Sequence, residues 1–310
     1  MNVVPIAFAF DNNLVLPACV CISSLMENAN QETFYDIFIL HSVHENLDKS
    51  KLGLLSEYYS NCRINYREVD ETFDNAFEIR GITTAAYYRL LIPELIPEYD
   101  KVMYADADII FRMDLFELYR MNLDGYLLAA TKDLGINLSI DGKNYIASTP
   151  GLCQGQYLQS GFIMMNTKLM RKAGMVNQFK TLAQRKYRYQ DQDILNIACC
   201  GKVCYLQPYY NMTDYSYYYF LYEFEQVKES YRNCDKEYGL NFGNIHFNGH
   251  KPWKKYCVNF DIWWEYYRKS PYFDEKFYFD FFYSKLNELD QLTLWKRIKI
   301  LIRYFIYGKK

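Results

Sequence analysis

The sequence has no run of about 20 apolar residues, so no segment is predicted to cross a bilayer as a helix. Residues 1–10 are apolar but few, no Lys or Arg precedes them, and Asp11 follows at once. This pattern favours a buried strand over a signal peptide. A net charge of −2 gives no overall bias toward nucleic acid, and we expect no nucleic-acid partner.

Linkers and internal repeats are missing as well. No segment rich in Pro, Gly and Ser divides the chain, and no repeat with a period of about 20–50 residues is present. Half of the residues are apolar and only 23% are charged, which indicates a folded globular protein. We therefore predict one catalytic domain over residues 1–285, followed by a distinct tail over residues 286–310.

Cysteine is present, but in an odd number. Nine cysteines without a secretion signal indicate reduced thiols in a cytosolic compartment. Cys199, Cys200 and Cys204 lie close in sequence, but their spacing fits no common zinc pattern. Tyr and Phe are abundant; their rings can stack on sugars or bases, but more often they fill a core or pack at the surface.

Strand-like and helix-like segments alternate along the first hundred residues. Strands are predicted at residues 3–10, 34–40, 63–68 and 101–104, and helices at residues 16–26, 47–59 and from 84 to near Pro93. Farther along, strands are predicted at residues 126–130 and 161–166, and a helix at residues 191–200. This alternation predicts an α/β fold with a mostly parallel sheet, which binds ligands at the carboxyl ends of its strands.

Two acids interrupt the apolar segment at residues 101–111. In an extended chain residues two apart point the same way, so Asp106 and Asp108 would face one spot. Burying two carboxylates together is costly without a cation, and their oxygen atoms suit Mn²⁺ or Mg²⁺. The alternative is a pair of loop acids that point into solvent.

Two later segments favour the metal interpretation. Residues 189–196 place several amides and acids before an apolar helix. Asp191 alone could cap this helix, so the segment has more polar groups than a cap requires. In residues 245–253, a neutral His246 could complete a metal shell and Lys251 could neutralise a phosphate. The alternative for His246 is a purely structural role.

Together these segments resemble glycosyltransferase family 8, the retaining GT-A enzymes that include bacterial lipopolysaccharide galactosyl- and glucosyltransferases and the glycogenins. The matching segments are residues 6–13, 83–91, 106–108, 160–166, 189–196 and 246–253, in the family's order. The resemblance implies a Rossmann-like GT-A sheet flanked by helices. It also implies Mn²⁺-dependent transfer of a hexose, galactose or glucose, from a UDP-hexose donor to a saccharide or lipid-linked acceptor of a cell-surface glycan.

The resemblance also implies roles for matching residues. Asp106, Asp108 and His246 correspond to the ligands of a Mn²⁺ (or Mg²⁺) ion that bridges the UDP diphosphate. The donor-binding positions are Ala9, Asp11, Asn13, Arg89, Asp106, Ala107, Asp133, Gln159, Gly249 and Lys251. Asp191 and Gln192 match the catalytic centre beside the anomeric carbon. An amide is a poor nucleophile, so front-face substitution is favoured, whereas a covalent intermediate would require a carboxylate such as Asp191.

Three features depart from the family pattern. Leu14 stands where many relatives have an aromatic ring on uracil, and Gln159 replaces an asparagine typical of bacterial members. The stretch from His246 to Lys251 is one residue shorter than in some galactosyltransferases.

The tail, residues 292–310, contains six cations and no acid. On a helix Lys296, Lys299 and Arg303 share one face. The opposite face carries Leu294, Ile298, Leu301, Ile302 and Phe305, with Trp295 at its border. This pattern predicts an in-plane helix on an anionic membrane surface, and hence a cytoplasmic protein held at the inner face of the membrane. The alternative is a terminal helix that packs on the domain.

Two other functions remain open at this stage. A sugar-nucleotide nucleotidyltransferase would be expected to carry a Gly-rich, basic phosphate loop after the first strand, and residues 10–14 lack one. A catalytically inactive UDP-sugar or carbohydrate-binding protein is compatible with the aromatic content, although sugar binding alone requires no metal triad.

Overall fold

The computed structural model describes residues 2–44, 46–73, 84–287 and 292–307. The chain divides into two compact units, Met1–Pro271 and Tyr272–Lys310. The second unit therefore begins before residue 286, where the sequence places the start of the tail.

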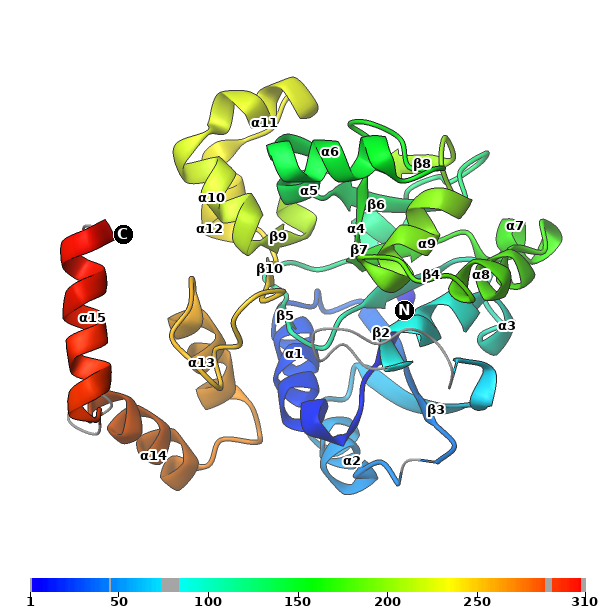
Figure 1. Cartoon of the computed structure of the whole chain (residues 1–310). Coiled ribbons are helices and arrows are strands. Elements are labelled where there is room, and N and C mark those ends of the chain that lie inside the picture. The colour runs from blue at the N-terminus through cyan, green and yellow to red at the C-terminus, as the bar shows by residue number, and fades with distance from the viewer. Residues whose placement is uncertain (1, 45, 74–83, 288–291, 308–310) are drawn as a thin grey trace. The chain divides into compact units, whose positions relative to one another are not determined.

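A seven-stranded sheet forms the centre of the first unit (Figure 1). Its strands, in spatial order, are β3 (Cys62–Val69), β2 (Thr33–Ser42), β1 (Asn2–Ala9), β4 (Val102–Ala105), β7 (Leu158–Met165), β6 (Leu128–Lys132) and β8 (Val203–Tyr205). All neighbours are parallel except β7, which is antiparallel to β4 and β6. The predicted mostly parallel sheet is confirmed.

The helices of the first unit flank this sheet or pack beside it. They include α1 (Val15–Glu27), α2 (Lys49–Tyr58), α5 (Leu134–Leu138), α6 (Ile140–Ser148), α7 (Thr167–Lys172), α8 (Met175–Ala183), α9 (Gln190–Ala198), α10 (Asp214–Tyr222), α11 (Phe224–Ser230), α12 (Lys236–Phe242) and α13 (Phe260–Lys269). Ala7 and Ala9 of β1 share a core with Phe38 of β2 and with Phe179 and Leu195 of α8 and α9. Burying this apolar surface contributes roughly 25 cal/mol per Å² to the free energy of folding. The packed core thereby fixes the ends of the strands.

The helix predicted to start at residue 84 differs in type and in its end. Thr84–Leu91 form a 3-10 helix, η3, and α3 (Ile92–Leu95) continues past Pro93. Proline is tolerated there because the N–H groups in the first turn of a helix have no partner within the helix, so the N–H that proline lacks is not needed. Residue 83, the start of the matching segment, lies outside the described residues.

A small second sheet sits beside the large one. Its strands are β5 (Ile109–Ile110), β10 (Ile245–His246) and β9 (Met212–Thr213), in that order. His246 pairs with Ile109 on one side and with Thr213 on the other. Three segments that are far apart in sequence therefore meet next to Asp108.

One disulfide was not expected. Cys153 and Cys200 are joined, so the prediction that all the thiols are reduced is wrong for this pair. The bond ties the segment between α6 and β7 to the residues that follow α9. The two cysteines lie 47 positions apart, and spacing alone does not reveal such a pairing.

The second unit contains α14 (Glu275–Leu286) and α15 (Leu294–Tyr307). The helix predicted in the tail is present, although Lys309 and Lys310 lie outside the described residues. Leu294, Trp295 and Phe305 are each more than 70% exposed. Within the described ranges, no helix is both long and apolar enough to cross a membrane.

Candidate active site

The site begins where two neighbouring parallel strands end. Ala7 of β1 is level with Tyr104 of β4, and the two strands end at Ala9 and Ala105 on the same carboxyl edge, with Asp106 directly after it. The strands are buried, which fixes the position of the backbone at this edge. The polar residues that follow the strands lie in the turns. Ligands bind at this edge in open α/β sheets.

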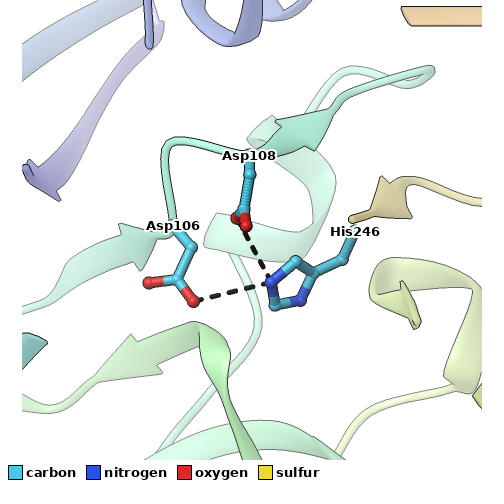
Figure 2. Close-up of side chains that lie close together, drawn as sticks. All are labelled: Asp106, Asp108 and His246. Carbon is cyan, nitrogen blue, oxygen red and sulfur yellow. Dashed lines mark ion pairs between the residues drawn. The ribbon is translucent and has the colours of Figure 1, made fainter. Parts of the chain in front are cut away.

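Asp106 lies just before a turn between β4 and β5 and Asp108 lies within it, so the extended conformation assumed from the sequence is wrong. Both carboxylates nevertheless face Nε2 of His246 (Figure 2). Oδ2 of Asp106 lies 3.5 Å from this nitrogen and Oδ1 of Asp108 lies 3.3 Å from it. The turn is held by the hydrogen bond from the N–H of Phe247 to the carbonyl of Asp108, 3.0 Å long.

This group has the composition and the space of a divalent-cation site. One ligand atom from each of Asp106, Asp108 and His246 lies within 4.8 Å of the others. Oδ1 of Asp108 is buried and accepts no well-formed hydrogen bond within the described part of the chain. Across residues 2–44, 46–73, 84–287 and 292–307, no cysteine belongs to such a group.

Gly161 of β7 leaves the room for this group. A Cβ atom at this position would lie 2.2 Å from Cε1 of His246 and 2.6 Å from Oδ2 of Asp106. Any other residue would displace one of the two ligands. Two hard oxygen ligands and one imidazole nitrogen fit Mn²⁺ or Mg²⁺.

Lys251 reaches into the same group. Its ammonium contacts Oδ2 of Asp108 and the carbonyl of Phe247. Burial by itself would raise the pKa of Asp108, but the charge of Lys251 and the contact with His246 hold that pKa well below its ordinary value.

Arg89 forms ion pairs with two acids of the site, Asp106 and Asp191. Its side chain is 5% exposed, and its Nε atom lies 3.2 Å from Oδ2 of Asp191. Nη1 donates to the carbonyl of Ser160 at 2.8 Å. Burial raises the pKa of Asp191 to about 6, and Arg89 opposes that rise.

Asp191 does not cap α9, although the sequence allowed this. Tyr189 precedes the helix, and its N–H donates to Asp193 at 2.7 Å. The backbone of Gln190 has a φ angle of 47°, which residues other than glycine rarely adopt. This backbone conformation lies immediately before Asp191 and Gln192, at the start of the helix that presents them.

Gln192 is held at both ends of its amide. Oε1 accepts from the N–H of Ser160 at 3.0 Å, and Nε2 donates to Oδ2 of Asp133 at 3.1 Å. Asp133 also caps α5 by accepting from the N–H of Ile136. Burial raises the pKa of Asp133.

The remaining predicted positions include residues that follow the ends of β1, β4 and β10. Asp11 accepts from the N–H of Asn13 at 2.9 Å and thereby begins η1 (Asn12–Leu14). Asn13 is exposed and Ala107 is buried. Gly249 approaches Asp214, because a Cβ at Gly249 would lie 2.3 Å from Oδ2 of that residue.

The sequence did not single out several residues that hold this site. Ser160 contacts Arg89, Asp191 and Gln192, and Asn211 contacts His246. Ser160 had one visible signal, since it and Gln159 are polar residues in a strand whose other side chains are apolar. Asn211 had no such signal, because its partners are 52 and 35 positions away.

Comparisons with known proteins agree with this geometry. The profile of Glycosyl transferase family 8 matches residues 5–257. A putative glycosyltransferase of Haemophilus influenzae is 28% identical, with 69% of this chain and 63% of that protein aligned. The lipopolysaccharide 1,2-glucosyltransferase of Escherichia coli K12 is 26% identical, with 82% of this chain and 73% of that protein aligned. The solved structure of galactosyltransferase LgtC, in complex with donor and acceptor sugar analogs, has a TM-score of 0.73 at 24% identity and covers 88% of this chain and 98% of its own. The fold is thus the GT-A fold of LgtC.

Proposed function

The chain belongs to glycosyl transferase family 8, and we propose on this basis that it is a retaining hexosyltransferase. The donor is a UDP-hexose, UDP-galactose or UDP-glucose, and the acceptor is a saccharide or a lipid-linked glycan. The product is part of a lipopolysaccharide- or capsule-type cell-surface glycan. The observation that carries the proposal is the convergence of Asp106, Asp108 and His246 at the carboxyl edge of the sheet.

The proposed donor site runs from β1 to the segment after β10. Ala9, Asp11 and Asn13 would hold uracil and ribose, and Lys251, with Gly249 beside it, would close over the diphosphate. Asp106, Asp108 and His246 would hold Mn²⁺ or Mg²⁺, which when bound offsets the charge that develops on the departing UDP.

Front-face substitution is the proposed mechanism, with the leaving oxygen of UDP helping to deprotonate the acceptor. Gln192 supports this choice because both ends of its amide already make hydrogen bonds. Oδ2 of Asp191 is likewise engaged, by Arg89 at 3.2 Å and by the hydroxyl of Ser160 at 3.2 Å. Detection of a glycosyl–Asp191 adduct by mass spectrometry would contradict this mechanism.

The function is tested by release of UDP from a panel of UDP-sugars, with and without Mn²⁺, for the wild type and Asp108→Ala. The proposal predicts metal-dependent release from one sugar and its loss in the variant. Binding of UDP-sugars without turnover in the presence of any acceptor would instead favour a non-catalytic binding protein. Turnover that is indifferent to both the metal and the substitution would refute the proposed site.

We also propose that α15 binds an anionic membrane surface. Lys296, Lys299 and Arg303 share one face of the helix, and the apolar side chains on the opposite face are exposed except for the half-buried Ile298. Each cation near an anionic surface contributes roughly 1 kcal/mol, so three contribute roughly 3 kcal/mol.

Co-sedimentation with phosphatidylglycerol vesicles tests the membrane proposal. A variant with Lys296, Lys299 and Arg303 changed to Glu is expected to remain in the supernatant. A matched variant with Lys168, Lys172 and Lys202 of the first unit changed to Glu should sediment like the wild type. Equal sedimentation of the two variants would refute membrane binding through α15.

A further inference from the structure

A line of buried amides lies behind His246, on the side away from the two acids. The N–H of Gly161 donates to Oε1 of Gln159 at 2.7 Å, and Nδ2 of Asn211 donates to the same oxygen at 2.6 Å. Oδ1 of Asn211 lies 3.0 Å from Nδ1 of His246. Gln159, Asn211 and His246 are at most 6% exposed, so water does not replace these hydrogen bonds.

The direction of every hydrogen bond in this line follows from its first member. A backbone N–H can only donate, so the atom of Gln159 that faces Gly161 is the carbonyl oxygen. That oxygen accepts, so Asn211 must turn its NH₂ group toward it. The carbonyl of Asn211 then faces His246, and Nδ1 of the imidazole must carry the proton that it donates.

The protonation of one ring nitrogen determines what the other can do. In a neutral imidazole with a proton on Nδ1, Nε2 has a lone pair and no proton. This lone pair faces Oδ2 of Asp106 and Oδ1 of Asp108, at 3.5 and 3.3 Å. Three acceptor atoms with no proton among them repel one another unless a cation lies between them.

We propose that Asn211, oriented by Gln159, is a positioning residue that fixes the tautomer of His246 and so prepares this ring to bind a divalent cation. The inference rests on the proposed metal site. It gives a role to the buried amides of Gln159 and Asn211. Among the described residues, neither amide makes a hydrogen bond to Asp106 or Asp108. Partners that orient a ligating histidine in this way commonly change metal affinity by about 10–100-fold when removed.

The tautomer can be observed directly by ¹⁵N NMR of the metal-free protein with labelled histidine, at mildly alkaline pH. The chain has only four histidines, and His246→Gln identifies the signals of His246. The proposal predicts a protonated Nδ1 and an unprotonated Nε2 in the wild type. A protonated Nε2 in the wild type overturns it without recourse to any further variant.

Two substitutions distinguish an effect of the hydrogen bonds of Gln159 and Asn211 from an effect of their packing. Asn211→Leu removes the acceptor for Nδ1–H, and we expect mixed tautomers and a 10–100-fold weaker affinity for Mn²⁺, measured by the EPR signal of free Mn²⁺. Gln159→Glu keeps an acceptor for both Gly161 and Asn211, and it should retain the wild-type tautomer. If Asn211→Leu retains the wild-type tautomer and Mn²⁺ affinity, the proposal is wrong.

Asn196→Leu controls for the loss of a buried amide elsewhere. Asn196 is 6% exposed and hydrogen-bonds both backbone groups of Leu158. We expect it to lower stability and leave the tautomer of His246 unchanged; a changed tautomer in this variant would contradict the specific role of Asn211. If the wild type shows the predicted tautomer but binds no Mn²⁺ or Mg²⁺, the proposed function fails, and with it the metal-binding part of this proposal, whereas the control of the tautomer by Asn211 stands.

Discussion

Nη2 of Arg89 donates to Oδ1 of Asp106 at 2.8 Å, and this hydrogen bond decides which oxygen of Asp106 remains for a cation. The hydroxyl of Tyr104 donates to the same oxygen, also at 2.8 Å. Oδ2 is therefore the oxygen that faces His246. Arg89 thus orients the carboxylate of Asp106 from behind, and the donor-binding role that the family resemblance implies for Arg89 stays a prediction.

Arg89→Met is expected to lower the free energy of unfolding by about 3–5 kcal/mol, measured by urea denaturation. The substitution leaves the buried carboxylate of Asp191 without its charge partner, and such losses are costly. Arg120→Met is the control, because the pair of Arg120 with Glu117 is exposed and should contribute less than about 1 kcal/mol. Equal effects of the two substitutions would show that Arg89 is not a structural centre of the site.

Gly161→Ala is expected to abolish Mn²⁺ binding in a titration calorimeter while the protein stays folded. The new methyl group would lie 2.2 Å from Cε1 of His246, so the ring or the strand must move. Gly53→Ala is the matched control, because no atom lies within 4 Å of its Cβ position in α2. That substitution should stabilise α2 by about 0.5–1 kcal/mol and leave Mn²⁺ affinity unchanged. Wild-type Mn²⁺ affinity in Gly161→Ala would contradict the location of the metal site.

Lys251→Met is expected to bind Mn²⁺ more tightly than the wild type in the absence of nucleotide. The ammonium of Lys251 contacts Oδ2 of Asp108 and competes with the cation for the same carboxylate. A gain of about tenfold corresponds to about 1.4 kcal/mol. In the presence of UDP the order should reverse, because the proposed phosphate contact is lost.

Lys254→Met provides the comparison for Lys251, since it removes a nearby exposed charge. Equilibrium dialysis with Mn²⁺ measures all three proteins. If Lys251→Met binds Mn²⁺ more weakly than the wild type without UDP, competition at Asp108 is disproved.

The pKa of Asp191, raised to about 6 by burial, predicts a pH dependence of stability. An unfolded Asp loses its proton near its ordinary pKa of 3.8, whereas the folded chain keeps this proton up to about 6. Between these values the native state binds more protons, so its stability falls as pH rises.

Asp191→Asn removes this titration. Relative to the variant, the metal-free wild type should lose about 3 kcal/mol of stability between about pH 4 and 7, at 1.36 kcal/mol per pKa unit. Urea denaturation across this range gives the difference, and the exposed Asp124→Asn serves as the control. A difference between wild type and Asp191→Asn that stays constant with pH would contradict the raised pKa.

The sequence predicted the sheet and its functional edge, because buried apolar strands and the acids after them leave a local pattern. Asp106 and Asp108 were visible for this reason, although the chain between them turns where an extended segment was expected. His246 was a weaker candidate ligand until the resemblance was added, since it lies 138 positions after Asp108 and no local pattern joins them.

The supporting residues were not predictable in the same way. Asn211 acts through hydrogen bonds to Gln159 and His246, and only the tertiary fold brings these two partners to it. The disulfide between Cys153 and Cys200 also depends on the packed fold, which brings the segment before β7 to the end of α9. Local propensity likewise did not distinguish η3 from an α-helix, because the two differ by one residue in the reach of their hydrogen bonds.

Calorimetric titration of UDP into the wild type and Asp108→Asn, each with and without Mn²⁺, tests the central claim most directly. The account predicts that Mn²⁺ strengthens UDP binding to the wild type by at least about tenfold, about 1.4 kcal/mol, and has no such effect on the variant. Asp124→Asn should behave as the wild type. UDP binding that is unaffected by Mn²⁺, or equally strengthened in Asp108→Asn, would contradict a metal-dependent nucleotide site at Asp106, Asp108 and His246.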